Sequence, residues 1–320
     1  MPTIEGLVHR LNLLRGQIYI DLGGHHRDSV LICGMQRSGT TWCADVINHN
    51  NDFRTIYEPF HNQRVPQAAR FATWQYLRPD DDDSEFLEPA TAIFEGRIRN
   101  WWISARNKRI VVRRRLVKDV RCLMMAGWIR AHFPEMPVIL LLRHPCAVLH
   151  SMRRLHWRSN TTDNILSQPR LMADHLEPFR GEIEAAADAV DDNIIAWCAN
   201  HYVAIRQLAG QRVCVVFYEH ILRDPHGEVA RIFAFLGRPF DKCAFARMMA
   251  PSNRIRVSRF GDSRALMIGG DTLGGWREHV APAQLERALE LLARFGLDEI
   301  YGPDPMPRVA NLSGFGIPVV

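Results

Sequence analysis

Three short apolar runs limit the fold of this chain more than any other feature of its sequence. They are VLIC at residues 30–33, VILLL at 138–142 and VCVVF at 213–217. Each run has the length of a buried strand and is too short for a buried helix of ordinary length. Turn residues and a helical pattern follow each run. Strands that alternate with helices form a parallel sheet, so the sequence predicts an α/β fold with helices on both faces of the sheet.

Helical patterns connect these strands. A long pattern from about 182 to 208 predicts one helix that Gly210 can stop, and a later pattern begins at Pro282 and can end at Gly296. We expect residues 156–181 to form a long connection over the surface and the acidic run PDDDDSE at 79–85 to form a solvated loop. Apolar helix faces are expected from Trp42, Cys43, Val46 and Ile47 after the first strand, and from Val148, Leu149 and Met152 after the second.

Composition limits the class of protein. The 320 residues are 47% apolar, which suffices for a large core, and we expect one domain with an N-terminal extension at 1–28 and a C-terminal tail at 298–320. Seven scattered cysteines without a CxxC pair indicate neither a disulfide framework nor a structural metal. Because no signal peptide and no apolar run of ~20 residues is found, we expect a cytoplasmic protein without a transmembrane segment.

The stretch GMQRSGTTW at 34–42 stands between the first predicted strand and its helix. A strand, a glycine-rich loop and a helix can form a phosphate site, where the N–H groups of residues 38–41 face the anion and the helix dipole adds roughly half a positive charge. Gly39 allows close approach of the backbone. A triphosphatase loop GxxxxGK[ST] has lysine where this chain has Thr40, and the cation stands instead at Arg37. Such a site suits a nucleotide with one phosphate-sized group and a further group beyond it.

A second stretch, RHPCAVLHSM, follows the strand VILLL and begins at Arg143. Arg143 stands at the carboxyl end of its strand, on the edge where open α/β sheets bind ligands. Ser151 comes eight residues later, about two turns into the next helix. These two side chains can hold a second phosphate. Taken singly, Arg143 also fits a surface ion pair and Ser151 an ordinary helix position.

Three stretches together resemble a known family. QRSGTTW at 36–42, RHPCAVLHS at 143–151 and GGWREHVAP at 274–282 are similar to the signatures of the sulfotransferases that use 3′-phosphoadenosine 5′-phosphosulfate (PAPS). The first resembles the 5′-phosphosulfate loop, the second the 3′-phosphate clasp, and the third the Gly-Trp-basic motif that covers the cofactor. Many members carry a basic pair before the third motif, where this chain has Gly269 and Gly270. The open candidates to complete the 3′-phosphate site are Arg256, Arg259 and Arg264.

The resemblance implies a P-loop NTPase-like sulfotransferase fold and a transfer from PAPS that needs no metal. In the family a cation lies near the oxygen that bridges phosphate and sulfate, and Arg37 occupies that position here. Negative charge builds on this oxygen during in-line transfer through a loose state, much as in phosphoryl transfer. A fixed guanidinium and the loop N–H groups stabilise that charge, an effect typically worth ~10²–10³ in rate per donor. The residues expected to bind the cofactor are Arg37, Ser38, Gly39, Thr40, Thr41, Trp42, Arg143, Ser151, Tyr218, Trp276 and Arg277.

The acceptor hydroxyl needs a base, which the resemblance assigns by position. The Lys-Thr-His triplet of many cytosolic members is replaced here by Val117, Lys118 and Asp119. Glu58 occupies the place of a glutamate in the protein-tyrosine and some bacterial members, and Lys118 that of a lysine which meets the sulfate. We expect burial to raise the pKa of Glu58 towards neutrality, and a general base typically contributes ~10²–10⁴ in rate. The reserve bases are His61 and Asp119.

A basic run from 97 to 121 offers rival interpretations. It holds ten Lys or Arg against one acid, with Trp101 and Trp102 among them, and can bind nucleic acid, form a solvated face or attract an anionic acceptor. A kinase that uses ATP and magnesium is the other enzyme alternative. We expect a hydroxyl acceptor on a small molecule, glycan or glycolipid, with a protein tyrosine as the alternative, and no nucleic-acid partner. Histidine spacing predicts no metal site, and adjacent His25 and His26 are expected to point apart.

Overall fold

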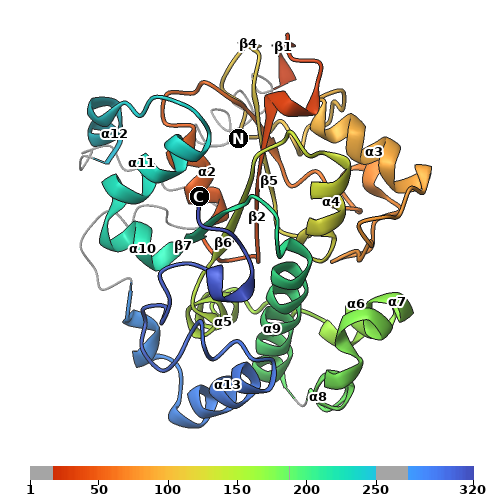
Figure 1. Cartoon of the computed structure of the whole chain (residues 1–320), viewed down its shortest axis with the longest axis vertical. Coiled ribbons are helices and arrows are strands. Elements are labelled where there is room, and N and C mark those ends of the chain that lie inside the picture. The colour runs from red at the N-terminus through yellow and green to blue at the C-terminus, as the bar shows by residue number, and fades with distance from the viewer. Residues whose placement is uncertain (1–16, 187, 250–272) are drawn as a thin grey trace, which may run out of the picture.

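A five-stranded parallel sheet forms the centre of the molecule, with the strand order β3-β5-β2-β6-β7 (Figure 1). The computed structural model describes residues 17–186, 188–249 and 273–320. All three strands predicted from the apolar runs are confirmed, as β2, β6 and β7. The strands of the sheet are β2 Ser29–Gly34, β3 Arg54–Tyr57, β5 Arg115–Asp119, β6 Val138–Leu142 and β7 Cys214–Phe217, while β1 Ile20–Asp21 pairs in parallel with β4 Val111–Val112.

Helices cover both faces of the sheet, as predicted. The helices α2, α10 and α11 pack on one face, and α3, α4, α5 and α9 pack on the other (Figure 1). Their bounds are α2 Thr40–Ile47, α3 Ser84–Phe94, α4 Ala126–His132, α5 Pro145–Arg153, α6 Thr161–Leu166, α7 Pro169–Leu171, α8 Arg180–Glu184, α9 Ala189–Leu208, α10 Tyr218–Arg223, α11 Pro225–Phe235, α12 Lys242–Met249 and α13 Pro282–Arg294.

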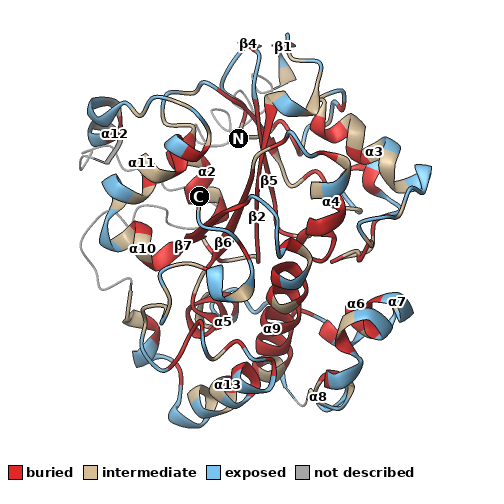
Figure 2. Ribbon diagram, viewed as in Figure 1, coloured by how far each residue is buried: buried red, intermediate tan, exposed pale blue. Residues whose placement is uncertain are grey.

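Two hydrophobic cores lie on either side of the strands. Successive residues of a strand point to opposite faces, so β2 contributes Leu31 and Cys33 to the larger core and Val30 and Ile32 to the smaller one. The central strands are buried along their whole length (Figure 2). Burial on both faces explains why these strands read as continuous apolar runs and not as an alternation of apolar and polar residues.

The order of the strands brings the two predicted phosphate stretches together. β2 and β6 are neighbours, with Leu31 opposite Val138. Because the strands are parallel, the loop after Gly34 and the turn after Leu142 leave the sheet at the same edge. We call this the carboxyl edge; it also carries the residues that follow β3, β5 and β7.

Two predictions about the connections are wrong. The pattern from 182 to 208 is not one helix, because α8 ends at Glu184 and α9 begins at Ala189. Asp188 starts α9 by accepting hydrogen bonds from the N–H groups of Val190 and Asp191, as aspartate commonly does at an N-cap. Residues 156–181 are not a simple surface connection. They form α6, α7 and shorter turns and bury apolar side chains, among them Leu171 and Leu176.

Other expectations agree with the structure. The predicted terminal helix is α13, and the acidic run stays a loop up to Asp83, which caps α3 by accepting from the Glu85 N–H. All seven cysteines are free, in agreement with the predicted lack of a disulfide framework. Within the described ranges, no helix has the length and apolar character needed to cross a membrane.

Candidate active site

The predicted phosphate loop joins β2 to α2. Gly39 is the N-cap of α2 with φ 93°, a left-handed conformation that glycine adopts without strain. A Cβ atom at this position would lie 2.5 Å from the ring of Tyr218, so only glycine fits. The N–H group of Ser38 donates to the Met35 carbonyl at 3.2 Å, and the expectation that it faces the anion is therefore wrong. The N–H groups in the first turn of α2 have no acceptor within the helix.

Arg37 connects the two predicted phosphate pockets. Its Nε donates to Ser151 Oγ at 2.9 Å, and Arg143 Nη1 donates to the carbonyl oxygen of Arg37 at 2.9 Å. The partners of these two guanidinium groups are thus a hydroxyl and a backbone carbonyl, not a carboxylate. Arg37 itself has φ 67°, a strained conformation for a residue other than glycine, which typically costs about 1–3 kcal/mol and is common at functional sites.

Tyr218 lies between these pockets, at the end of β7. Its ring contacts Gly39 and meets the Trp42 ring edge-on at a centroid distance of 5.9 Å. The Arg143 guanidinium lies over the same ring, 4.4 Å from its centroid, a cation–π contact that fixes the arginine. Burial raises the pKa of Tyr218 to about 12, so its hydroxyl keeps its proton and can donate a hydrogen bond.

Several buried polar atoms of the residues that follow β2, β6 and β7, and of Trp276, have no hydrogen-bond partner among the described residues. Buried donors nearly always find an acceptor in folded proteins, so a cluster of unpaired donors indicates a ligand site. All of them can donate, which is what an anion requires. They are Ser38 Oγ, Trp42 Nε1, Arg143 Nε, Tyr218 Oη and Trp276 Nε1.

Glu58 follows β3 at the carboxyl edge and forms ion pairs with two cations. Lys118 Nζ lies 2.6 Å from Glu58 Oε1, and Arg121 Nη1 lies 3.1 Å from Oε2. Burial by itself would raise the pKa of Glu58, but the charges and hydrogen bonds of Lys118 and Arg121 outweigh it and lower the pKa to about 2. The predicted rise towards neutrality is therefore wrong. The pKa is low because Lys118 on β5 and Arg121 just after β5 both form ion pairs with this one carboxylate.

The two reserve bases have different surroundings. Asp119 is fully buried and accepts hydrogen bonds from the N–H groups of Phe60 at 2.9 Å and Arg121 at 2.6 Å, so it fixes the loop that carries Glu58. Burial, together with the charge of Arg121, lowers the pKa of His61 to about 4. The His61 imidazole is therefore neutral, and its Nδ1 is buried without a partner among the described residues.

Tyr57 lies next to Glu58 at the end of β3. Burial and the neighbouring Glu58 carboxylate raise the pKa of Tyr57, so its hydroxyl keeps its proton. Lys118 Nζ lies over the Tyr57 ring, 4.9 Å from the centroid. The structure thus brings the predicted catalytic residues Glu58 and Lys118 to the same edge as the predicted cofactor loop.

The third predicted motif lies in a 3₁₀ turn at Gly275–Glu278. Trp276 stacks on His144, which follows Arg143, at a centroid distance of 4.5 Å and an interplanar angle of 18°. Arg277 Nη2 instead donates to Asp304 Oδ1 at 2.9 Å in the C-terminal tail. The candidates for the 3′-phosphate site at Arg256, Arg259 and Arg264 lie outside the described residues, as do Gly269 and Gly270.

Glu219 is a residue of this site that the sequence patterns did not single out. It is only 2% exposed and accepts hydrogen bonds from the His144 N–H and the Tyr301 hydroxyl, both at 2.8 Å. It therefore joins the turn after β6 to the start of α10 and to the C-terminal tail. Burial raises the pKa of Glu219. The local signal that could have identified it is an acidic residue two positions after a buried strand, next to Tyr218.

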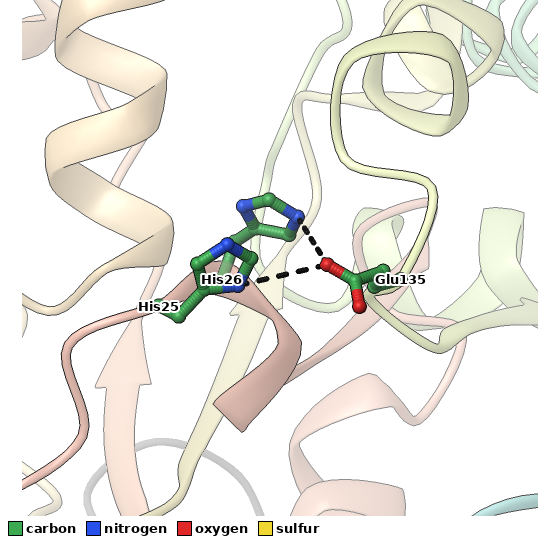
Figure 3. Close-up of side chains that lie close together, drawn as sticks. All are labelled: His25, His26 and Glu135. Carbon is green, nitrogen blue, oxygen red and sulfur yellow. Dashed lines mark ion pairs between the residues drawn. The ribbon is translucent and has the colours of Figure 1, made fainter.

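One prediction fails away from the carboxyl edge. The sequence suggests that His25 and His26 point apart, but their ring centroids are 4.0 Å apart and both rings face Glu135 (Figure 3). The backbone is extended at His25 and enters a 3₁₀ turn, η1 His26–Asp28, at the next residue. The alternation of side chains that an extended strand would give is therefore broken between the two histidines.

Known proteins resemble this chain over most of its length. Residues 29–242, more than half of the chain, match the Sulfotransferase family. The nodulation protein NoeE of Sinorhizobium fredii is 25% identical over 283 residues, which are 82% of this chain and 64% of NoeE, so the chain spans less than two thirds of that relative. Human sulfotransferase 1C2 is 22% identical over 287 residues, 83% of this chain and 82% of that protein.

Among solved structures, mouse sulfotransferase SULT7A1 complexed with PAP aligns with 91% of this chain and 90% of its own length, at 15% identity and a TM-score of 0.44. The stretch that matches the family contains the phosphate loop, Glu58, Arg143 and Ser151. This chain belongs to the sulfotransferase family.

Proposed function

We propose that this protein is an enzyme that transfers a sulfuryl group from PAPS to a hydroxyl of a small molecule, glycan or glycolipid. One observation carries the proposal: Arg37 links the loop after β2 to Ser151 and Arg143 after β6 through two hydrogen bonds of 2.9 Å. Two anion pockets at neighbouring strand ends suit a nucleotide with two separate anionic ends. Membership of the family supports the same class of reaction.

The polar atoms at the site fit PAPS. Ser38 Oγ and the N-terminus of α2 would hold the 5′-phosphosulfate, because N–H groups and the helix dipole both favour an anion there. Arg143 Nε and Ser151 would hold the 3′-phosphate, and the Tyr218 hydroxyl can donate to either end. When bound, PAPS supplies an activated sulfuryl group and a phosphate leaving group. The unpaired donors of Ser38, Arg143 and Tyr218 would then have acceptors.

Each catalytic residue has a task in this proposal. Arg37 stabilises the negative charge that grows on the leaving oxygen, a role that requires a fixed cation before the reaction begins. Glu58 takes the proton of the acceptor hydroxyl, and its low pKa keeps it ionised at neutral pH. A carboxylate with a pKa of about 2 is a weak base, and general bases work best with a pKa near the operating pH. Lys118, when it contacts the sulfuryl group, weakens its pairing with Glu58 and makes that carboxylate more basic.

The basic run lends little support to nucleic-acid binding. Arg115 is fully buried and pairs with Asp21 at 2.9 Å, and Lys118 is buried against Glu58. Binding that depends on release of counterions needs cations that can reach phosphates from outside, which these two cannot do. The idea of one solvated face is likewise wrong for this part of the run. The exposed members are Arg97, Arg99, Lys108, Arg109, Arg113 and Arg114, and they can attract an anionic acceptor.

Thermal unfolding with three ligands tests the donor. We expect millimolar PAP to raise the melting temperature, and RNA or ATP with magnesium to leave it unchanged, because a ligand that binds only the folded chain stabilises it. A shift with RNA and none with PAP would contradict the enzyme, and a larger shift with ATP and magnesium would favour a kinase.

The acceptor is tested by transfer of radiolabelled sulfate from PAPS into a panel of alcohols, sugars, phenols and a tyrosine peptide. Label in alcohols or sugars supports the proposal. Label in the tyrosine peptide alone would favour a protein acceptor, the alternative that the position of Glu58 suggests.

A further inference from the structure

A second group of ligand-forming side chains lies at the opposite edge of the sheet. His25 and His26 precede β2, and Glu135 precedes the neighbouring strand β6. Because β2 is six residues long, this cluster is roughly 20 Å from the phosphate loop at the other end of the strand. Figure 3 shows the two imidazole rings and the carboxylate turned toward one another. The proposed transfer of sulfate gives these residues no role.

The geometry of the cluster is close to that of a metal site. His25 Nδ1 and His26 Nε2 both lie 3.9 Å from Glu135 Oε2, and the three ligand atoms are all within 4.8 Å of one another. A separation of 3.9 Å is too long for a hydrogen bond. Around a tetrahedral zinc ion with bonds of about 2.0–2.1 Å, ligand atoms are about 3.4 Å apart, so each 3.9 Å separation must shorten by roughly half an ångström and the widest separation, at most 4.8 Å, by up to about 1.4 Å. The side chains of Glu135 and His25 are 56% and 41% exposed and can make these shifts.

A second observation also indicates a ligand. His26 Nε2 is buried and has no hydrogen-bond partner in the ranges that the structure describes. The His26 ring is held in place, since it packs edge-on against Phe133 at 5.3 Å. Arg115 Nη2 anchors the backbone of His25 by donating to its carbonyl at 2.6 Å, which leaves the His25 ring able to turn. His25 Nδ1 accepts one long hydrogen bond, 3.2 Å, from the Arg27 N–H, which a metal bond would replace.

We propose that His25, His26 and Glu135 bind a divalent cation of the zinc class. Two imidazoles and one carboxylate are typical zinc ligands, whereas magnesium prefers oxygen ligands alone. The ion would tie the start of β2 to the turn before β6 and so stabilise the amino edge of the sheet. Three protein ligands leave one tetrahedral position for water. At this distance from Arg37 the ion takes no part in sulfate transfer.

Calorimetric titration of the full chain, treated with EDTA and then given zinc chloride, tests the site. We expect saturable binding of one zinc ion per chain, no binding of magnesium, and a rise in melting temperature on the order of a few degrees at a hundredfold excess over Kd. Glu135→Gln keeps the shape of an exposed side chain and should weaken zinc binding at least tenfold. His26→Ala should abolish it. His226→Ala, which removes an exposed histidine outside the cluster, is the matched control.

Zinc binding that is equally strong in Glu135→Gln and His26→Ala would overturn the proposal, as would uptake by the unaltered chain without saturation. If His26→Ala fails to fold, Glu135→Gln still decides, because its exposed position makes it safe for folding. Transfer of sulfate from PAPS should persist after EDTA treatment. A result that contradicts the zinc site therefore leaves the proposed sulfotransferase activity untouched, and the reverse also holds.

Discussion

Arg37 Nε lies 2.9 Å from Ser151 Oγ, although 114 residues separate the two in the chain. The contact crosses from the loop after β2 to the helix after β6, and Arg143 reinforces it by donating to the Arg37 carbonyl. The residue proposed to stabilise the leaving group thus touches the residue proposed to hold the 3′-phosphate. In our proposal one connected set of side chains recognises both ends of the donor.

The first prediction concerns Arg37→Ala. We expect kcat to fall by ~10²–10³, the usual effect of losing one donor aimed at developing negative charge. The fold should survive, since the side chain makes a single hydrogen bond among the described residues and is only partly buried. Steady-state kinetics with PAPS, together with thermal unfolding, measure both effects. Arg153→Ala is the control and should keep full activity, because Arg153, at the end of α5, is exposed and donates to Gln284. An active Arg37→Ala enzyme would refute the role of Arg37.

A second prediction follows from the low pKa of Glu58. The ordinary value is 4.5 and the folded value is about 2, so the ion pairs of Glu58 stabilise the fold above pH 4.5, and this stability is lost as the pH falls from 4.5 towards 2. The lowered pKa of Glu58 contributes about 3 kcal/mol to the free energy of unfolding at neutral pH. Glu58→Gln should lose a similar amount at pH 7, because Lys118 is left buried without its counter-charge, and should show less change between pH 4.5 and 3. Urea unfolding at several pH values gives these free energies.

The same variant separates structure from chemistry. Glu58→Gln should keep PAP binding and lose ~10²–10⁴ in kcat if Glu58 is the base. Glu88→Gln, an exposed acid on α3, serves as the control for both assays. Should Glu58→Gln turn over at the normal rate, His61, with its neutral imidazole and unpaired Nδ1, becomes the better candidate.

A third prediction concerns the two hydrogen bonds that Glu219 accepts next to the site. Tyr301→Phe removes one of the two hydrogen bonds to the buried carboxylate of Glu219, at a typical cost of about 1–3 kcal/mol in stability. Because Glu219 also holds the His144 N–H, next to Arg143, we expect the KM for PAPS to rise severalfold with a smaller change in kcat. Tyr202→Phe is the control, because this tyrosine is partly exposed and lies on α9, away from Glu219 in the sequence. A loss of stability with an unchanged KM would make the role of Tyr301 purely structural.

Features that depend on a few consecutive residues were predicted correctly from the sequence. Features that depend on contacts between distant residues were not. The strands, the glycine at position 39 and the apolar face of α2 are all visible within a few consecutive residues, and the structure agrees with them. The break before α9 was also local, since Asp188 is a good N-cap, but the apolar periodicity obscured it. The pKa of Glu58 could not be predicted, because Lys118 and Arg121 reach it only once β3 and β5 pair. Glu219 was missed for the same reason, as its partners come from 75 and 82 residues away.

The last prediction uses Arg121, which shares Glu58 with Lys118. Arg121→Gln removes one of the two cations that lower the pKa of Glu58, and the loss of an opposite charge at this distance should raise that pKa by roughly one unit or more. If Glu58 is the base, the acid limb of the profile of kcat/KM against pH should move upward by the same amount. Arg64→Gln, at an exposed arginine near His61, is the control and should leave the limb in place. An acid limb that Arg121→Gln does not move would mean that the titrating group is not Glu58. Because Arg121 also lowers the pKa of His61, a limb that moves in both Arg121→Gln and Arg64→Gln would favour His61 as the base.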